Sequence, residues 1–294
     1  MRPSSVLVDA QELQRLCRSS EPPRLLDVRW RLGDPTGREQ FLAGHIPGAS
    51  FVDLDRELAA EASPRAGRHP LPSLGQLQAA ARRWGLREGE TAVAYDDNAS
   101  MSAARAWWLL RWGGVETVYL LDGGLSAWRA AGGELAMGPE LAEPGDVELS
   151  PGHMPTVLID GVAEVPQRGL LLDARAAERF RGDLEPVDPK AGHIPGAVSA
   201  PTTGNLTAAG RFRAARELED RFLGLGARPD APIAVYCGSG VTAAHEIAAL
   251  SIAGLQAALY PGSWSEWSNH EDRPVATGPS PAGPSPGPST GPGC

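Results

Sequence analysis

The chain carries one sequence unit twice, and this duplication limits the possible folds more than any other feature. Its "LLDVR" strand returns as "LLDAR", its "AGHIPGA" motif returns unchanged, and two longer segments return in altered form. The four matched pairs are 25–29 with 171–175, 43–49 with 191–197, 92–110 with 233–250, and 118–128 with 257–267. A repeat this long exceeds the ~20–45 residues of a solenoid unit, so it indicates a duplicated domain.

Apolar strand segments alternate with helical segments in both copies. In the second copy, "APIAVYC" is a continuous apolar run, and "GVTAAHEIAALSIAGL" after it is typical of a buried helix. Continuous apolar strands separated by helices favour a parallel sheet that is covered on both sides. The sequence therefore predicts an α/β protein of two tandem domains, each a mainly parallel sheet with helices on both faces.

The domain boundaries follow from changes in composition. We expect the first domain at 1–137, a linker rich in Pro, Gly and acidic residues at 138–157, and the second domain at 158–275. Residues 276–294 are almost entirely Pro, Gly, Ser, Ala and Thr and offer little to bury, which predicts a disordered tail. The cysteine at its end, Cys294, has no evident role.

Charge and cysteine content exclude several classes of partner. The chain has 27 Lys and Arg against 36 Asp and Glu, a net charge of −9, and no strongly basic window. Nucleic acid and anionic membranes are therefore not expected as partners, and no apolar run approaches the ~18 residues of a membrane span. Three cysteines make no disulfide framework, so we expect a cytoplasmic protein with reduced thiols.

Cys237 follows a predicted strand and precedes a predicted helix. Ligands of parallel α/β sheets bind at this edge, where the helix N-terminus attracts negative charge. The loop Gly238-Ser239-Gly240-Val241-Thr242 can turn its N–H groups inward to hold an anion. These features favour a nucleophilic thiolate that forms a persulfide over a merely structural, buried cysteine.

Two comparisons within the sequence narrow the chemistry of this thiol. Cysteine phosphatases need an arginine six positions after the cysteine to grip phosphate, and that position here is Ala243. The first copy carries Asp96 or Asp97 where the second has Cys237. An aspartate cannot carry sulfur, so we expect only the second copy to be active.

The repeated motifs together resemble those of the two-domain rhodanese-like sulfurtransferases, over about residues 5 to 275. The loop "CGSGVTA" is similar to that of the 3-mercaptopyruvate sulfurtransferase branch, whereas thiosulfate-specific relatives carry basic residues just after the cysteine. The resemblance implies that Cys237 takes sulfur from 3-mercaptopyruvate as a persulfide and releases pyruvate. It also implies transfer to thioredoxin, a small thiol or cyanide, with no metal or organic cofactor.

The resemblance also assigns roles to site residues. Ser239 would hydrogen-bond near the reacting sulfur, with His45 and Asp34 of the first domain completing a Ser–His–Asp relay. His193 occupies the same motif position in the second copy, so the alternative is that each histidine bonds only its own loop. The members of the anion cradle would be Gly238, Gly240, Val241 and Thr242.

The donor carboxylate requires a cation. Arg179 matches a substrate-binding arginine of the family, but a second arginine is missing, and Lys190 or Arg181 would have to substitute. Lysine lacks the planar fork of arginine, which leaves thiosulfate as an alternative donor. A persulfide carrier without rapid turnover is the alternative from a different class.

Three other segments have structural explanations. The aromatic run "ARAWWLLRWGG" at 104–114 predicts core and domain-interface packing, as do Trp264 and Trp267. The charges in "SPRAGRHP" at 63–70 are too few to predict a binding patch.

Overall fold

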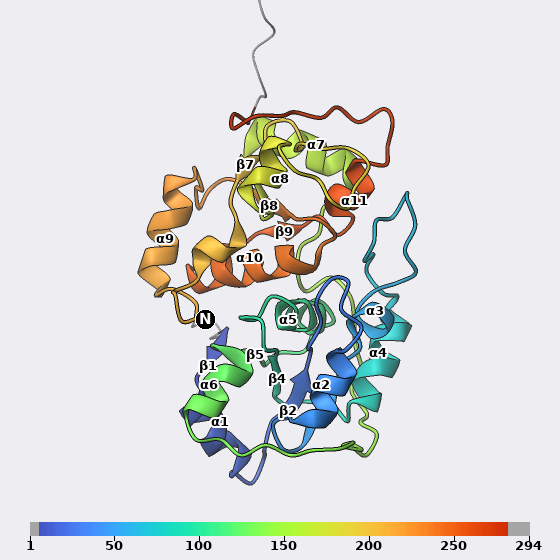
Figure 1. Cartoon of the computed structure of the whole chain (residues 1–294), viewed down its shortest axis with the longest axis vertical. Coiled ribbons are helices and arrows are strands. Elements are labelled where there is room, and N and C mark those ends of the chain that lie inside the picture. Colours follow the sequence, from blue (N-terminus) through green and yellow to red (C-terminus); the bar gives the residue numbers. More distant parts are fainter. Residues whose placement is uncertain (1–5, 282–294) are drawn as a thin grey trace, which may run out of the picture.

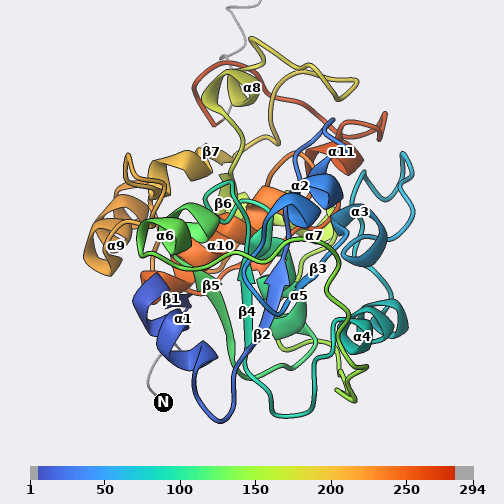
Figure 2. The same ribbon diagram turned by 60° about the horizontal axis from the view of Figure 1, so that its bottom comes forward.

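The computed structural model describes residues 6–281. In the first domain, five parallel strands lie in the order β1 (Leu7–Val8), β5 (Val118–Leu121), β4 (Ala92–Tyr95), β2 (Arg24–Asp27) and β3 (Ala49–Phe51). Figure 2 shows these strands side by side in this order. The helices are α1 (Ala10–Cys17), α2 (Gly37–Ala43), α3 (Leu54–Glu57), α4 (Leu74–Arg83), α5 (Ala103–Trp112) and α6 (Gly124–Ala130).

The second domain repeats this order with four parallel strands. They are β9 (Ala258–Leu259), β8 (Ile233–Tyr236), β6 (Leu170–Asp173) and β7 (Val198–Ser199). A parallel bridge from Thr156 to Leu259 stands where the first domain has β1. The helices are α7 (Ile159–Arg168), α8 (Ala177–Arg181), a 3₁₀ turn (Thr202–Asn205), α9 (Ala215–Gly224), α10 (Val241–Ile252) and α11 (Ser263–Trp267).

Each sheet has helices on both faces, as the apolar strands predicted. One face of the first sheet packs on α1, α2 and α6, and one face of the second on α7, α8 and α11. The other two faces share a single apolar cluster that runs from one domain into the other. Helices α5 and α10 meet inside it, one above the other in Figure 1. The predicted packing role of "ARAWWLL" is confirmed, because Trp107 and Trp108 are buried there.

The repeated "LLDxR" strands place a buried ion pair behind each "GHIPGA" motif. Arg29 Nη2 lies 2.7 Å from Asp27 Oδ2 and donates to the carbonyl of Gly44 at 2.8 Å. The equivalent residues of the second domain are Asp173, Arg175 and Gly192. Because an unpaired buried charge is costly, each arginine stays bound to its aspartate. Its hydrogen bond to the glycine carbonyl then holds the chain in place where the motif begins.

The predicted linker is packed rather than free. Val147 and Leu149 are buried in the shared cluster, and Gly138 N–H donates to the carbonyl of Leu42. The segment 138–157 therefore lies along the first domain before it enters the second.

The tail boundary predicted at 276 is too early. Ala276 pairs with His193 in an antiparallel bridge, and the Pro281 carbonyl accepts from Gly196 N–H at 2.7 Å. These contacts satisfy backbone groups of the second domain, so 276–281 belong to it. The remainder of the predicted disordered tail, with Cys294, lies outside the described residues.

Candidate active site

Cys237 directly follows strand β8 and lies almost fully buried, with 1% of its surface exposed. The N–H of Gly240 donates to its Sγ at 3.1 Å, so the loop turns inward as expected. Gly240 has a φ of +81°, and a Cβ there would stand 2.5 Å from the carbonyl oxygen of Pro261. Only glycine fits this position, which explains the second glycine of the loop. Val241 and Thr242 begin α10 directly behind it.

Ser239 takes part in a three-residue relay that crosses the domain interface. Its Oγ lies 2.8 Å from Nδ1 of His69, and His69 Nε2 lies 3.2 Å from Oδ1 of Asp55. The hydrogen bond with His69 lowers the pKa of Asp55, so this carboxylate is ionised and accepts from Nε2–H. That tautomer leaves Nδ1 free to accept the hydroxyl proton of Ser239.

The structure corrects the prediction of His45 as a relay member. His45 is fully buried, stacks on Phe41 at 3.9 Å between ring centroids, and binds the Phe41 carbonyl through Nδ1 at 2.8 Å. His193 does the same with Phe180, at 3.7 Å and 2.8 Å. The repeated histidine therefore has the same structural role in both copies.

Asp34 is not part of the relay either. Its Oδ1 accepts the N–H of Thr36 at 2.9 Å and the hydroxyl of the same residue at 2.5 Å. These two hydrogen bonds lower its pKa. Asp34 therefore stabilises the turn before α2. The aspartate of the relay, predicted to be Asp34, is Asp55 in the structure.

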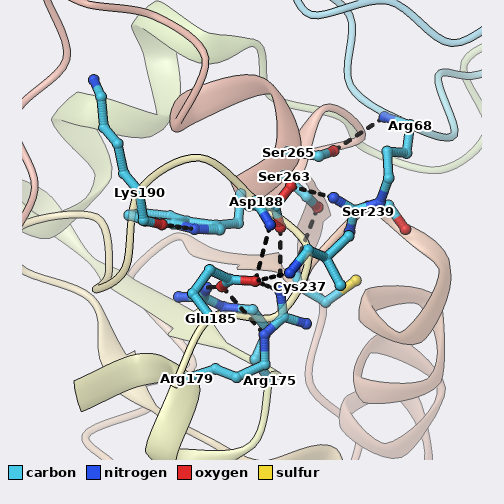
Figure 3. Close-up of polar contacts among 12 residues, drawn as sticks. Arg68, Arg175, Arg179, Glu185, Asp188, Lys190, Cys237, Ser239, Ser263 and Ser265 are labelled. Carbon is cyan, nitrogen blue, oxygen red and sulfur yellow. Dashed lines mark hydrogen bonds and ion pairs between the residues drawn. The ribbon is translucent and has the colours of Figure 1, made fainter. Parts of the chain in front are cut away.

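Two arginines from different domains lie over Gly238, next to Cys237 in the chain. A Cβ on Gly238 would stand 3.1 Å from Nη2 of Arg68 and 3.3 Å from Nη1 of Arg179. Both arginines pair with Asp188, and Arg179 also pairs with Glu185 (Figure 3). The glycine at 238 leaves room for both guanidinium groups beside the cysteine.

These arginines keep N–H groups that no protein acceptor uses. Arg68 Nε is buried without a partner, and its Nη2 makes no hydrogen bond within residues 6–281. Arg179 donates through Nε and Nη2, which leaves Nη1 toward Gly238. A carboxylate can use these free groups without displacing Asp188, because each guanidinium has five N–H donors.

The two acids that pair with these arginines, Glu185 and Asp188, have pKa values shifted in opposite directions. Burial disfavours ionised Glu185, but hydrogen bonds from Arg179 and from backbone N–H groups outweigh it and lower the pKa. Burial raises the pKa of Asp188, with Arg68 acting in the opposite direction.

Lys190 and Arg181 do not replace the missing arginine. The ammonium of Lys190 donates to the carbonyl of His270 at 2.7 Å, and Figure 3 shows it pointing away from Cys237. Arg181 pairs with Asp183 at the surface. The second cation is instead Arg68, from the "SPRAGRHP" segment, for which the sequence predicted no binding role. Gly67 packs against Gly262 of the other domain, which carries this loop across the interface.

Arg105 of α5 is a fully buried cation behind the cysteine loop. Its Nη1 donates to the carbonyl of Gly240 at 3.2 Å, and other donors bind carbonyls of residues 58, 69 and 70. Burial lowers its pKa to about 10, and negative charge on Cys237 acts in the opposite direction. Arg105 is therefore charged near neutral pH. The sequence signal for it was an arginine near the start of an apolar helix, on its buried side, whereas Arg111 lies in the last turn.

Comparison with known proteins identifies the family. A model described as "Rhodanese-like domain" matches residues 9–131 and 155–270. The chain belongs to the rhodanese family. The predicted resemblance, fold and domain duplication are confirmed.

Three relatives show how closely the chain follows the family. It is 50% identical to a Pseudomonas aeruginosa protein named as a 3-mercaptopyruvate sulfurtransferase, over 94% of this chain and 99% of that one. It is 45% identical to a Mycobacterium tuberculosis protein named as a thiosulfate sulfurtransferase, over 93% and 97%. A crystal structure of an Escherichia coli 3-mercaptopyruvate sulfotransferase superposes with a TM-score of 0.79 at 33% identity, over 88% and 99%. Such sulfurtransferases are enzymes, which confirms the prediction from the sequence.

Within residues 6–281, no three His, Cys, Asp or Glu side chains are grouped as a metal site. The helices of the same region are too short or too polar to cross a bilayer.

Proposed function

We propose that this protein is a sulfurtransferase that moves sulfur from 3-mercaptopyruvate through a Cys237 persulfide to a thiol acceptor. The observation that carries the proposal is the convergence on one buried cysteine of a Ser–His–Asp relay and two arginines with free donors. The relay suits a donor with a carbonyl, and the arginines suit a donor with a carboxylate.

The first half-reaction forms the persulfide. Thiolate Cys237 attacks the donor sulfur, the carbon–sulfur bond breaks, and its electron pair leaves as the enolate of pyruvate. The enolate takes the proton that the donor thiol brought, so pyruvate and an anionic persulfide remain. We assign the polarisation of the donor carbonyl to Ser239. When the donor binds, the hydroxyl turns its proton from Nδ1 of His69 to the carbonyl oxygen, which makes the enolate a better leaving group. Arg68 and Arg179 hold the carboxylate.

The second half-reaction regenerates the Cys237 thiolate. An acceptor thiol attacks the outer sulfur, the sulfur–sulfur bond breaks, and Cys237 leaves as a thiolate. Thioredoxin or a small thiol fits this step, and cyanide is a chemical substitute. Because the cycle requires reduced thiols, the cytoplasmic location expected from the sequence is part of this proposal.

The charge of the site favours 3-mercaptopyruvate over thiosulfate. Asp188 and Glu185 offset the charges of Arg68 and Arg179, so the clamp has a net charge near zero before the donor binds. A donor with one negative charge suits this balance better than a dianion, which Asp188 would repel. The 45% identity to a relative named as a thiosulfate sulfurtransferase keeps thiosulfate as the second candidate.

The test is steady-state turnover with each donor, using a thiol acceptor, for the wild-type protein and Cys237→Ser. We expect a higher kcat/KM for 3-mercaptopyruvate, and loss of both activities in the variant. Preference for thiosulfate would reject the donor assignment, and activity that persists in Cys237→Ser would reject the mechanism. A stable Cys237 persulfide, detected by mass spectrometry, without turnover on either donor would identify a carrier instead.

A further inference from the structure

Arg105 is buried without an anionic partner in the described part of the chain. All its hydrogen bonds go to backbone carbonyl oxygens, at 3.0 to 3.2 Å, and none goes to an acid. The buried arginines of the two "LLDxR" strands differ from it in this respect. Arg29 is paired with Asp27, and Arg175 is paired with Asp173. Burying a cation without a counter-ion costs several kcal/mol, so an unpaired one needs an explanation.

The group whose negative charge acts on Arg105 is Cys237. Gly240 lies between the two side chains: its N–H donates to Sγ, and its carbonyl accepts from Arg105 Nη1. Cys237 is 1% exposed and Arg105 is fully buried, so little water screens charges at either position. Attraction between them is stronger here than it would be at the surface.

We propose that Arg105, contributed by the domain without a catalytic cysteine, is the counter-ion of the Cys237 thiolate and of its persulfide. It acts as a positioning and charge-balancing residue through Gly240, beyond the donor clamp and the relay. The inference rests on the proposed function only in taking Cys237 as the nucleophile.

The other charged groups around Cys237 cannot replace Arg105. The set consists of the relay residues Asp55 and His69, the clamp residues Arg68, Arg179, Glu185 and Asp188, and the buried pair Arg175 and Asp173. Arg175 is already neutralised by Asp173 and Glu185. Arg68 and Arg179 are partly neutralised by their shared acids and are free to bind the donor, so their effect on the thiolate changes once the donor is bound. Arg105 stays buried behind the loop, and its charge is available in every state of the cycle.

The test measures the thiol directly and needs no turnover. The rate of Cys237 alkylation by iodoacetamide is followed against pH in a Cys17→Ser, Cys294→Ser background. Removing the charge in Arg105→Gln or Arg105→Met should move the half-maximal rate to higher pH by about one unit or more. Arg105→Lys keeps the charge and should restore most of the wild-type profile. Arg111→Met, on the same helix, is the matched control.

A profile for folded Arg105→Gln that superimposes on the wild type would overturn the inference. So would a shift in Arg105→Lys as large as that in Arg105→Gln, because it would implicate geometry rather than charge. If 3-mercaptopyruvate and thiosulfate both fail as donors while the profile shifts, the inference stands and the proposed function does not.

A second measurement covers the case in which the neutral variants do not fold. In the same background, Cys237 of the otherwise wild-type protein is alkylated with either iodoacetamide or iodoacetate, which leave neutral and anionic adducts of similar size. The anionic adduct keeps a partner for Arg105, so we expect the carboxymethylated protein to have the higher Tm. Because Arg68 and Arg179 can also meet the added carboxylate, the comparison is repeated in Arg68→Met and in Arg179→Met, where the difference in Tm should persist. Equal Tm values, or a higher Tm for the neutral adduct, would overturn the inference.

Discussion

The two copies of the strand-to-helix loop show how one backbone design supports either stability or chemistry. In the first copy, Asp96 turns its carboxylate into its own loop. Oδ1 accepts N–H groups of residues 98 and 100 at 2.8 and 2.9 Å, and Oδ2 accepts those of 102 and 103 at 2.9 Å. In the second copy, Sγ of Cys237 accepts one, from Gly240. The first cradle is filled by its own anion, and the second keeps capacity for a substrate.

Each loop is also contacted by the helix that follows the other loop. Arg105 of α5 reaches the carbonyl of Gly240, and His245 of α10 lies beside the backbone of Ala99. Burial lowers the pKa of His245 to about 3, so this ring is neutral near pH 7. The cation Arg105 thus faces the loop of Cys237, whose anion changes during the cycle. The neutral ring of His245 faces the loop of Asp96, whose carboxylate is already hydrogen-bonded by its own loop.

The largest expected effect comes from placing the first copy's side chain in the second loop. Cys237→Asp should lower sulfur transfer at least ~1,000-fold, because the nucleophile is lost and a carboxylate repels the donor. The fold should persist, since Asp96 shows that this loop design accepts an aspartate. Turnover and circular dichroism measure the two outcomes. An unfolded variant would show that the two cradles are not interchangeable.

A second change tests the filled loop of the first copy. Asp96→Asn keeps one carbonyl oxygen but turns an NH₂ group toward the N–H groups of residues 102 and 103. Losing two charge-assisted hydrogen bonds and opposing donors in a buried site should lower the free energy of unfolding by about 3 kcal/mol. Urea titration measures it. Unchanged stability would mean that Asp96 is not the element that holds this loop.

The helix after the active loop has a buried acid whose ionisation should appear in the stability. Burial raises the pKa of Glu246 from 4.5 to about 7, with Arg221, 3.6 Å away, acting against it. A raised acid pKa contributes stability below 4.5 that is lost as the pH rises through about 7. Glu246→Gln removes this dependence, so the loss of unfolding free energy between about pH 5 and pH 8 should shrink by roughly 2 kcal/mol.

His245, next to Glu246 in the chain, affects the pH dependence of stability in the opposite direction. Its lowered pKa contributes stability that is present above 6.5 and lost as the pH falls. Both proteins contain His245, so comparing them at the same pH cancels its contribution. Parallel stability curves for wild type and Glu246→Gln would show that Glu246 does not ionise in this range.

Residues near one another in sequence were predicted well, and residues that meet across the interface were not. The cysteine and its glycines follow from a strand and a loop with clear patterns, and Arg179 follows from the family resemblance. His69 and Arg68 lie in a loop between α3 and α4 that has no periodicity, so nothing local shows that it reaches the other domain. The sequence did hold a signal against His45. A histidine that is repeated in both the inactive and the active copy indicates a structural role that the two copies share.

The smallest effect concerns the loops that cross the interface. The loop at 63–70 brings His69 to Ser239, whereas the second domain's loop that reaches the first brings the Phe212 N–H to Asp122 at 3.0 Å and carries no histidine. Asp55→Asn should therefore lower kcat for 3-mercaptopyruvate about 10-fold, because an amide no longer fixes the His69 tautomer, and partial exposure limits the loss. His45→Asn is the control: it should lower Tm and leave kcat per folded molecule unchanged. A larger loss of kcat in His45→Asn than in Asp55→Asn would return the relay to the repeated motif.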